Sequence, residues 1–317
     1  MQKCELLAPA GSYNAIEPLI DAGADAVYVG LRGFSSRPAS SDLSMDEIRC
    51  AVGLCHSKGV QLHVAVNSCI AFDAADRLLA SIKEMDASGV DAVIIADWGI
   101  IERACQMTER IRIHASTLLG VYNSTTVRRL RDMGVKRVVF STNLYLDEMA
   151  SIVNSVPELE YEIVADGGIC FNDNRICELP HANEREDYRV FCRLDYQLRK
   201  GGVVQHANPI AAEQITSAEV LALYIEMGIM SFKVEGRTVD PEKILPRIRQ
   251  LRTAMDAGQK NGGSSVLHYV CTRQNPEVKR NTAIAAMMSL VNDFYSKGGI
   301  TRDELHTLFC VISRNAR

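Results

Sequence analysis

Three cysteines lie in one polar stretch of the chain, where their thiolates could converge on a metal. Cys170 follows an apolar, strand-like run that breaks at Gly167 and Gly168, and Cys177 and Cys192 come later in the same helix-poor segment. Iron–sulfur clusters take cysteine ligands, commonly four, and structural zinc takes four nitrogen or sulfur ligands. Cysteine is also a small hydrophobe that often packs in a core. The spacing alone leaves both interpretations open, and no fourth ligand is obvious.

Polar side chains at the ends of apolar runs form a second candidate site. We assign catalytic roles to Glu235, Arg237, His114 and Asp97, and substrate-binding roles to Tyr28, Arg32, Asn67 and Asp166. Arg237 would bind a carboxylate or phosphate, Glu235 would orient it or transfer a proton, and His114 would shuttle protons. Alternatively, Glu235 and Arg237 pair with each other, because residues two apart on a strand share a face. We expect Lys233 to form an ion pair with Glu235.

A glycine followed by a short β-favouring run recurs along the chain and indicates the fold. Such runs follow Gly23, Gly59, Gly89, Gly134 and Gly228, where glycine suits the left-handed residue just past a helix. Eight buried strands are expected near residues 5–9, 26–31, 61–67, 93–97, 112–117, 137–142, 161–166 and 231–236. Helix-period segments separate nearly all of them, one opened by a capping box at Ser44–Glu47.

Eight βα units predict an α/β fold, a (β/α)8 TIM-like barrel, whose active residues sit at the C-terminal ends of the strands. A doubly wound sheet is the alternative, but no Gly-x-Gly-x-x-Gly follows the first strand. We expect residues 1–257 to form the barrel and to carry a Cys-rich loop at about 170–211. Loops of that length are usually functional. Residues 258–317 are expected to form a glycine-rich linker and a C-terminal helical extension.

Composition limits the partners and the compartment. The formal net charge of -4 gives no overall basic field, which argues against nucleic acid as a partner. No stretch reaches the roughly 18 apolar residues that a membrane helix needs, and the N-terminal residues lack a signal-peptide pattern. We therefore expect a cytoplasmic protein without a membrane span. Ten cysteines then favour a metal site or plain burial over disulfides.

Four sequence blocks, taken together, resemble the peptidase U32 family over roughly residues 4–256. They are Glu5–Gly11, Gly23–Gly30, Glu162 with Cys170 and Cys177, and Phe232–Arg237. The better understood members of that family look like oxygen-independent hydroxylases that carry a 4Fe–4S cluster. They act on tRNA, ribosomal RNA or ubiquinone precursors, with prephenate as the hydroxyl source in the tRNA case. The RNA-acting members have an added C-terminal β domain that is not apparent here. This chain is therefore more similar to the ubiquinone-type members, which work as pairs of related subunits.

The resemblance implies that Cys170, Cys177 and Cys192 are cluster ligands, but the fourth family cysteine has no counterpart here. His206 lies at about the right place, and histidine replaces cysteine on iron in Rieske centres. Cys271 could instead fold back, or one iron could keep an open site for substrate. Loss of the cluster, or its formation only with a partner, also stays open. Three cysteines and a histidine also fit structural zinc.

Three functions follow from these observations. The first is an iron–sulfur hydroxylase, an oxidoreductase acting on a small or carrier-bound substrate. The second is a peptide hydrolase, for which the chain offers neither His-Glu-x-x-His nor Gly-x-Ser-x-Gly. The third is a non-catalytic subunit that docks on a related barrel as a heterodimer partner. We expect the first function, with the cluster at the barrel mouth.

Overall fold

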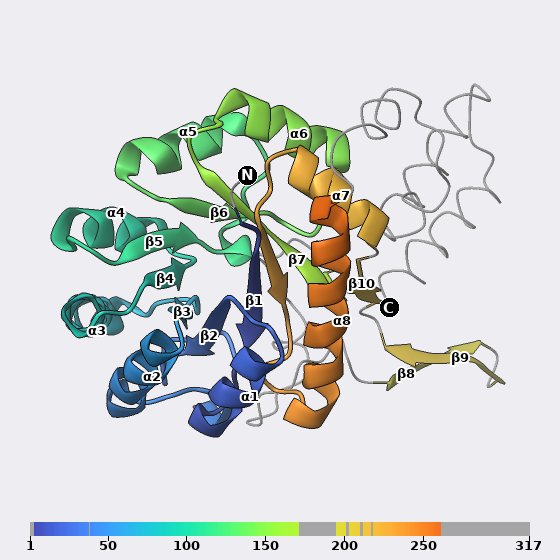
Figure 1. The fold of residues 1–317 in the computed structure, drawn as a ribbon, viewed down its shortest axis with the longest axis horizontal. Helices are drawn as coiled ribbons and strands as arrows, with labels where there is room; N and C mark the ends of the chain where they lie inside the picture. The colour runs from blue at the N-terminus through green and yellow to red at the C-terminus, as the bar shows by residue number, and fades with distance from the viewer. Residues whose placement is uncertain are drawn as a thin grey trace.

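A closed ring of eight parallel strands, surrounded by helices, forms the structure, which is a computed structural model (Figure 1). It describes residues 3–37, 39–170, 195–200, 203–209, 212–216 and 218–260. The barrel strands are β1 (Glu5–Pro9), β2 (Ala26–Gly30), β3 (Gln61–Val66), β4 (Ala92–Ile95), β5 (Arg112–Ala115), β6 (Arg137–Val139), β7 (Glu160–Ile169) and β11 (Ser231–Val234). Pairing of β6 with β7, β7 with β11 and β11 with β1 closes the ring. The predicted TIM-like barrel is confirmed, with all eight predicted strands present.

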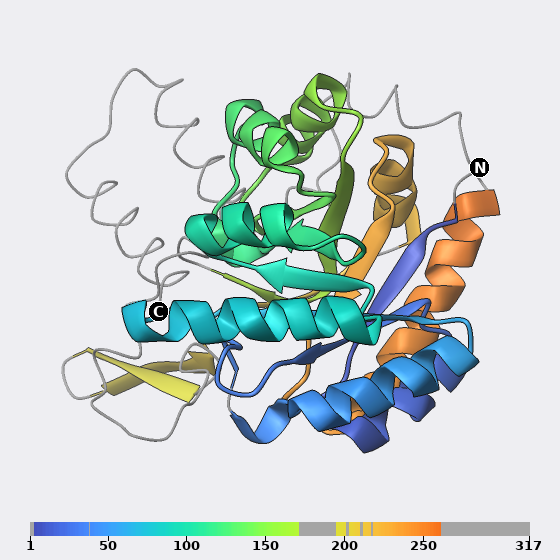
Figure 2. The ribbon, with the colours of Figure 1, turned by 90° about the vertical axis from the view of Figure 1, so that its left-hand side faces the viewer.

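Helices connect the strands on the outside of the ring (Figure 2). They are α1 (Ile16–Asp21), α2 (Met45–Ser57), α3 (Ala75–Ser88), α4 (Trp98–Met107), α5 (Ser124–Met133), α6 (Leu146–Ser155), α7 (Ala218–Glu226) and α8 (Pro241–Lys260). The five glycines predicted to follow helices have φ between 69° and 108°, as a left-handed position requires. The predicted capping box also forms, since Ser44 accepts from the Glu47 amide and Glu47 from the Ser44 amide. No helix in the described ranges has the length and apolarity to cross a membrane.

The insertion after β7 contains strands that the sequence did not predict. A hairpin of β8 (Asp195–Lys200) and β9 (Val203–Pro209) is followed by β10 (Ala212–Ile215), which pairs antiparallel with the end of β7. Because Ala212 lies opposite Ile169, the insertion returns to the barrel beside Cys170. The predicted linker begins later than residue 258, since α8 continues to Lys260. The predicted helical extension lies outside the described residues.

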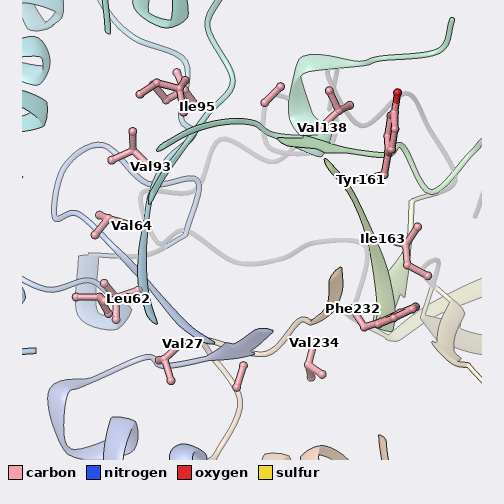
Figure 3. Packing of buried hydrophobic residues seen from close by; sticks show 14 of the residues in the cluster. Val27, Leu62, Val64, Val93, Ile95, Val138, Tyr161, Ile163, Phe232 and Val234 are labelled. Atoms are coloured by element: carbon pink, nitrogen blue, oxygen red, sulfur yellow. The ribbon is translucent and has the colours of Figure 1, made fainter. Parts of the chain in front are cut away.

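The main hydrophobic core lies between the ring and the helices. In Figure 3 its labelled side chains point away from the ring of strands. They are Val27, Leu62, Val64, Val93, Ile95, Val138, Tyr161, Ile163, Phe232 and Val234. Side chains alternate along a strand, so the intervening residues face the barrel axis. Many of those inward residues are polar and buried, including His63, His114, Arg137, Glu162 and Lys233, and Glu5 is nearly buried.

Arg137 organises the N-terminal end of the barrel interior. Its guanidinium donates to Glu5 on β1, to Glu160 and Glu162 on β7, and to Ser231 on β11. Burial raises the pKa of Glu5, but the charges of His63 and Arg137, together with the hydrogen bonds from Arg137 and Ser231, outweigh it and bring that pKa to about 2. One buried cation therefore joins four neighbouring strands of the ring.

Replacing Arg137 with methionine should lower the free energy of unfolding by about 3–5 kcal/mol, because the buried Glu162 and the nearly buried Glu5 would lose their counter-charge. Urea denaturation at pH 7 measures this loss. Arg129 is the matched control, since its side chain is 64% exposed and its ion pair with Glu102 is at the surface. Arg129→Met should change the free energy by less than about 1 kcal/mol. Equal effects of the two substitutions would refute the role given to Arg137.

Acid should weaken the fold through Glu5. Its folded pKa of about 2 lies below its ordinary value of 4.5, so its contribution is fully present above pH 4.5 and is lost as the pH falls toward 2. A depression of this size corresponds to roughly 3 kcal/mol. Urea denaturation at pH 7 and pH 3 should show a smaller difference for Glu5→Gln than for wild type. The exposed control Glu109→Gln should keep the wild-type difference, and an unchanged difference in Glu5→Gln would contradict the assignment.

Candidate functional site

Arg237 lies at the C-terminal end of the barrel, in the turn after β11. It is nearly buried, and its guanidinium donates to Asp42 Oδ1 at 2.8 Å and to Ser35 Oγ at 2.7 Å. Asp42 and Ser35 belong to the long connection between β2 and α2. The ion pair therefore fastens that connection over the mouth of the barrel.

The Arg237–Asp42 pair is electrostatically costly to disrupt. Burial raises the pKa of Asp42, opposed by the Arg237 charge, and burial lowers the pKa of Arg237. Asp42 Oδ2 is buried and has no hydrogen-bond partner among the described residues. A buried carboxylate with one oxygen that accepts no hydrogen bond depends on its cation for stabilisation. Loss of Asp42 or Arg237 would therefore leave the other as a buried, unpaired charge.

Tyr28 and Lys233 form the floor beneath Arg237. Lys233 Nζ lies 4.2 Å from the centre of the Tyr28 ring, and Arg237 Cζ lies 5.7 Å from it. The Tyr28 hydroxyl donates to the Val234 carbonyl at 3.0 Å. The predicted Lys233–Glu235 ion pair is wrong, because Lys233 Nζ faces Glu162 Oε1 at 3.7 Å. Lys233 faces the axis one layer below the mouth, so Glu162 is the carboxylate within its reach.

Burial lowers the pKa of Lys233, opposed by the charge of Glu162. A lysine in such surroundings gives up its proton more readily than a solvated one. Its side chain is 11% exposed, and its amine lies over the Tyr28 ring beneath Arg237. Lys233 can therefore act as a proton donor or acceptor.

Glu235 links the turn after β11 to the end of β7. Its Oε2 accepts from the Gly168 amide at 3.2 Å, and its Oε1 lies 3.8 Å from the Arg37 guanidinium. The alternative that Glu235 pairs with Arg237 does not hold, since each has another partner. Gly168 precedes Cys170 by two residues, so Glu235 contacts the backbone next to the first predicted ligand.

Cys170 is the only predicted cluster ligand whose side chain falls within the described residues. It is partly buried and follows β7, where β10 pairs with the strand. Cys177 and Cys192 lie outside the described residues. The backbone of His206 lies on β9 opposite Leu198, but its side chain is not among those that the structure describes. No group of three metal-binding side chains occurs within the described ranges, so the ligand set stays a prediction.

His114 lies inside the barrel rather than at its mouth. It is fully buried, and its ring meets the His63 ring edge-on at 5.1 Å between centroids. Neither ring nitrogen has a hydrogen-bond partner among the described residues. Burial holds the pKa of His114 well below its ordinary value, so the ring is neutral. His114 is therefore not at the mouth, where a proton shuttle was predicted from the sequence.

Asp97 and Asp166 have structural partners. Asp97 caps α4 by accepting from the Ile100 amide at 2.9 Å. Asp166 is buried and accepts from Arg247 Nε of α8 at 2.8 Å. The bulge where β7 pairs with β11 brings Asp166 within reach of α8, which explains why it does not join the mouth cluster.

Asn67 and Arg32 lie at the rim. Asn67 Oδ1 accepts from the Ser36 amide at 3.2 Å, which holds the connection after β2 against the end of β3. Arg32 is exposed and donates to Glu47 at 3.4 Å. Of the eight predicted polar residues, the structure brings Tyr28, Glu235 and Arg237 together.

Asp42, Ser35 and Arg37 complete the cluster, and sequence reasoning did not assign Asp42 to the site. One feature of the sequence, the glycine at position 30, is related to the contact between Arg237 and Asp42. A Cβ on this residue would lie 1.9 Å from Arg237 Nη1 and from Asp42 Oδ1. A strand residue without a side chain often marks close approach of another group. Gly236 supports the same arrangement, because its φ of +145° favours glycine just before Arg237.

Comparisons with known proteins agree with this architecture. A family model described as "Peptidase family U32" matches residues 11–297. A solved structure described as the U32 peptidase Mk0906 superposes with a TM-score of 0.51 at 11% identity, covering 74% of this chain and 94% of that one. At this identity the likeness concerns the fold alone.

Two relatives from bacteria have names that refer to RNA modification. The chain is 29% identical over 263 residues to the 23S rRNA 5-hydroxycytidine C2501 synthase of Escherichia coli, covering 80% of this chain and 40% of the relative. It is 27% identical over 277 residues to the tRNA hydroxylation protein P of Helicobacter pylori, covering 81% and 65%. The chain thus spans less than two thirds of either relative.

The sequence-based argument against nucleic acid is wrong. It rested on the net charge of -4, yet the relatives named above are described as acting in rRNA and tRNA hydroxylation. Net charge reports the whole molecule, whereas recognition of RNA depends on local charge and on stacking surfaces.

Alanine at Gly30 should disrupt the mouth, because its Cβ would displace the Arg237–Asp42 pair. We expect a loss of about 1–3 kcal/mol in the free energy of unfolding, typical of overpacking, measured by urea denaturation. Gly53 is the matched control, since it lies in α2 and a Cβ added there would have no other atom within 4 Å. Gly53→Ala should stabilise by about 0.5–1 kcal/mol through helix propensity. A Gly30→Ala protein as stable as wild type would contradict the packing argument.

Proposed function

Because this chain belongs to peptidase family U32, we propose that it is the barrel of an iron–sulfur-dependent, oxygen-independent hydroxylase that adds a hydroxyl group to a base of RNA. The observation that carries the proposal is the span of the alignments. The two relatives named for rRNA and tRNA hydroxylation align over about four fifths of this chain. The family match over residues 11–297 includes the barrel from β2 to α8, and in barrel enzymes the chemistry sits at the C-terminal mouth.

The cofactor of this proposal is a 4Fe–4S cluster on Cys170, Cys177 and Cys192, with His206 as the fourth ligand. Cys170 fits this role, since it is partly exposed, ends a barrel strand, and lies beside the Glu235–Gly168 contact. Thiolate ligands of this kind suit an iron–sulfur cluster, and with His206 they also suit zinc. When bound, the cluster would supply one-electron transfer at the mouth.

The chain's own residues would bind and orient the reacting groups. Arg37 and Glu235 are 29% and 21% exposed, so an anionic group could replace Glu235 as the partner of Arg37 at small cost. Arg237 is committed to Asp42 and Ser35 and would position that site. Lys233 would hold or release a proton at Nζ, with Glu162 as the neighbouring base.

Deleting the gene from its source organism should remove one nucleoside that is heavier than its parent by a single oxygen atom. Mass spectrometry of nucleosides from digested rRNA and tRNA measures this. Wild type should restore the modification, and Cys170→Ser should not, because serine is a poor iron ligand. The control is Cys50→Ser, since Cys50 is exposed on α2, and it should restore the modification fully.

Metal content tests the cofactor separately. Anaerobically purified protein should contain about four irons and four sulfides per chain, and the Cys170→Ser variant should lose them. An unchanged set of RNA nucleosides in the deletion strain would overturn the proposed activity. Zinc in place of iron would overturn the proposed cofactor.

A further inference from the structure

Two aromatic side chains stand exposed at the mouth of the barrel. Phe72 is 101% exposed and Trp98 is 39% exposed, and they are the only large apolar side chains classed as exposed in the described ranges. Phe72 opens the 3-10 turn Phe72–Ala74 after β3, and Trp98 is the first residue of α4 after β4. Both therefore follow the C-terminal ends of barrel strands.

Their positions lie on adjacent parts of the rim. Strands β3 and β4 pair in parallel up to their last residues, Val66 and Ile95. Helices α3 and α4, which begin next to the two aromatic residues, run side by side in Figures 1 and 2. Asp76 in the first turn of α3 pairs with Arg103 of α4 at 2.9 Å. The connection after β3 and the connection after β4 therefore start at neighbouring strand ends and lead into neighbouring helices.

Cationic side chains continue the same rim. Arg32 and Arg37 lie in the connection after β2, the strand next to β3. Asn67 and Ser68, just after β3, hold that connection by accepting from the Ser36 amide and by donating to the Phe34 carbonyl. Two guanidinium groups thus lie on the connection next to the one that carries Phe72, Arg32 paired with Glu47 and Arg37 with Glu235.

We propose that Phe72 and Trp98 form a stacking platform for unpaired bases of the RNA substrate, with Arg32 and Arg37 facing its phosphates. The inference rests on the proposed function. A single exposed apolar residue needs no explanation, but two exposed aromatic rings on adjacent connections, with guanidinium groups on the next connection, match how proteins hold single-stranded RNA. Bases next to the target would stack on these rings and direct the target base toward the mouth.

Trp98 is the only tryptophan of the chain, so its fluorescence reports directly on stacking. Titration of the full chain with an unstructured, end-labelled oligoribonucleotide should quench Trp98 emission as the label anisotropy rises. Phe72→Ala and Trp98→Ala should each raise the Kd by roughly 5- to 150-fold, the effect of losing one stacked base. Trp98→Phe should retain most of the affinity because it keeps an aromatic face.

Lys83→Ala is the control, since Lys83 is exposed on the same helix that follows Phe72. It removes one positive charge without touching an aromatic ring and should change the Kd by less than about twofold. The two alanine variants should also keep the wild-type dependence of Kd on salt, because stacking neutralises no phosphate.

Wild-type Kd values in both alanine variants, or Trp98 emission that stays constant while RNA binds, would overturn the platform. The hydroxylase proposal would survive that result, since the nucleoside analysis tests it independently. A stable oligomer that Trp98→Ala dissociates would also overturn the platform, because it would assign these rings to a protein interface. If the deletion strain keeps all its RNA modifications while the oligonucleotide still quenches Trp98, the platform stands and the hydroxylase assignment falls.

Discussion

The barrel depends on one buried guanidinium, that of Arg137. It joins β6 to β7, β11 and β1, four neighbouring strands, through two carboxylates of β7, one of β1 and the Ser231 hydroxyl. The pairings of β6 with β7, β7 with β11 and β11 with β1 are those that close the ring between its last and first strands. Apolar residues could fill this space, but a cation with several fixed acceptors also selects which strands meet. Ionic groups in a core act this way in some proteins, at a cost in desolvation.

Polar residues continue upward from this network and shape the mouth. Glu162 accepts from Arg137 with one oxygen and faces Lys233 with the other. Lys233 lies over the Tyr28 ring, which also faces Arg237. A column of charged and aromatic groups therefore runs from the closing network to the mouth. The column ends beneath Arg237, whose guanidinium is held by Asp42 and Ser35.

Local sequence patterns predicted the strands and helices of the fold, but they did not predict which polar side chains pair with each other. Strands and helix ends follow from apolar periods and from glycines such as Gly89 and Gly134, which depend on neighbouring residues only. The partner of Arg237 is Asp42, 195 residues away, and nothing in the sequence near Asp42 distinguishes it from a solvated loop carboxylate. His114 failed for a related reason. Its place on a strand was predicted, but its register opposite Arg137 of β6, which puts it in the buried layer at the other end of the barrel, was not.

The two ends of the barrel differ in how easily their charges can change partners. Around Arg137 the ions are held by several short hydrogen bonds and are mostly buried, so exchange would strand a charge. At the mouth, Arg37 and Glu235 stand 3.8 Å apart and are partly exposed, where an ion pair contributes little and can be replaced. An anionic group can therefore compete for Arg37 at the mouth, but not for Arg137 at the other end or for Arg237, whose partner Asp42 is buried. The ion pair of Arg37 costs less to exchange than those of Arg137. This difference, more than the presence of charge, makes the C-terminal end the better suited of the two to bind and release a ligand.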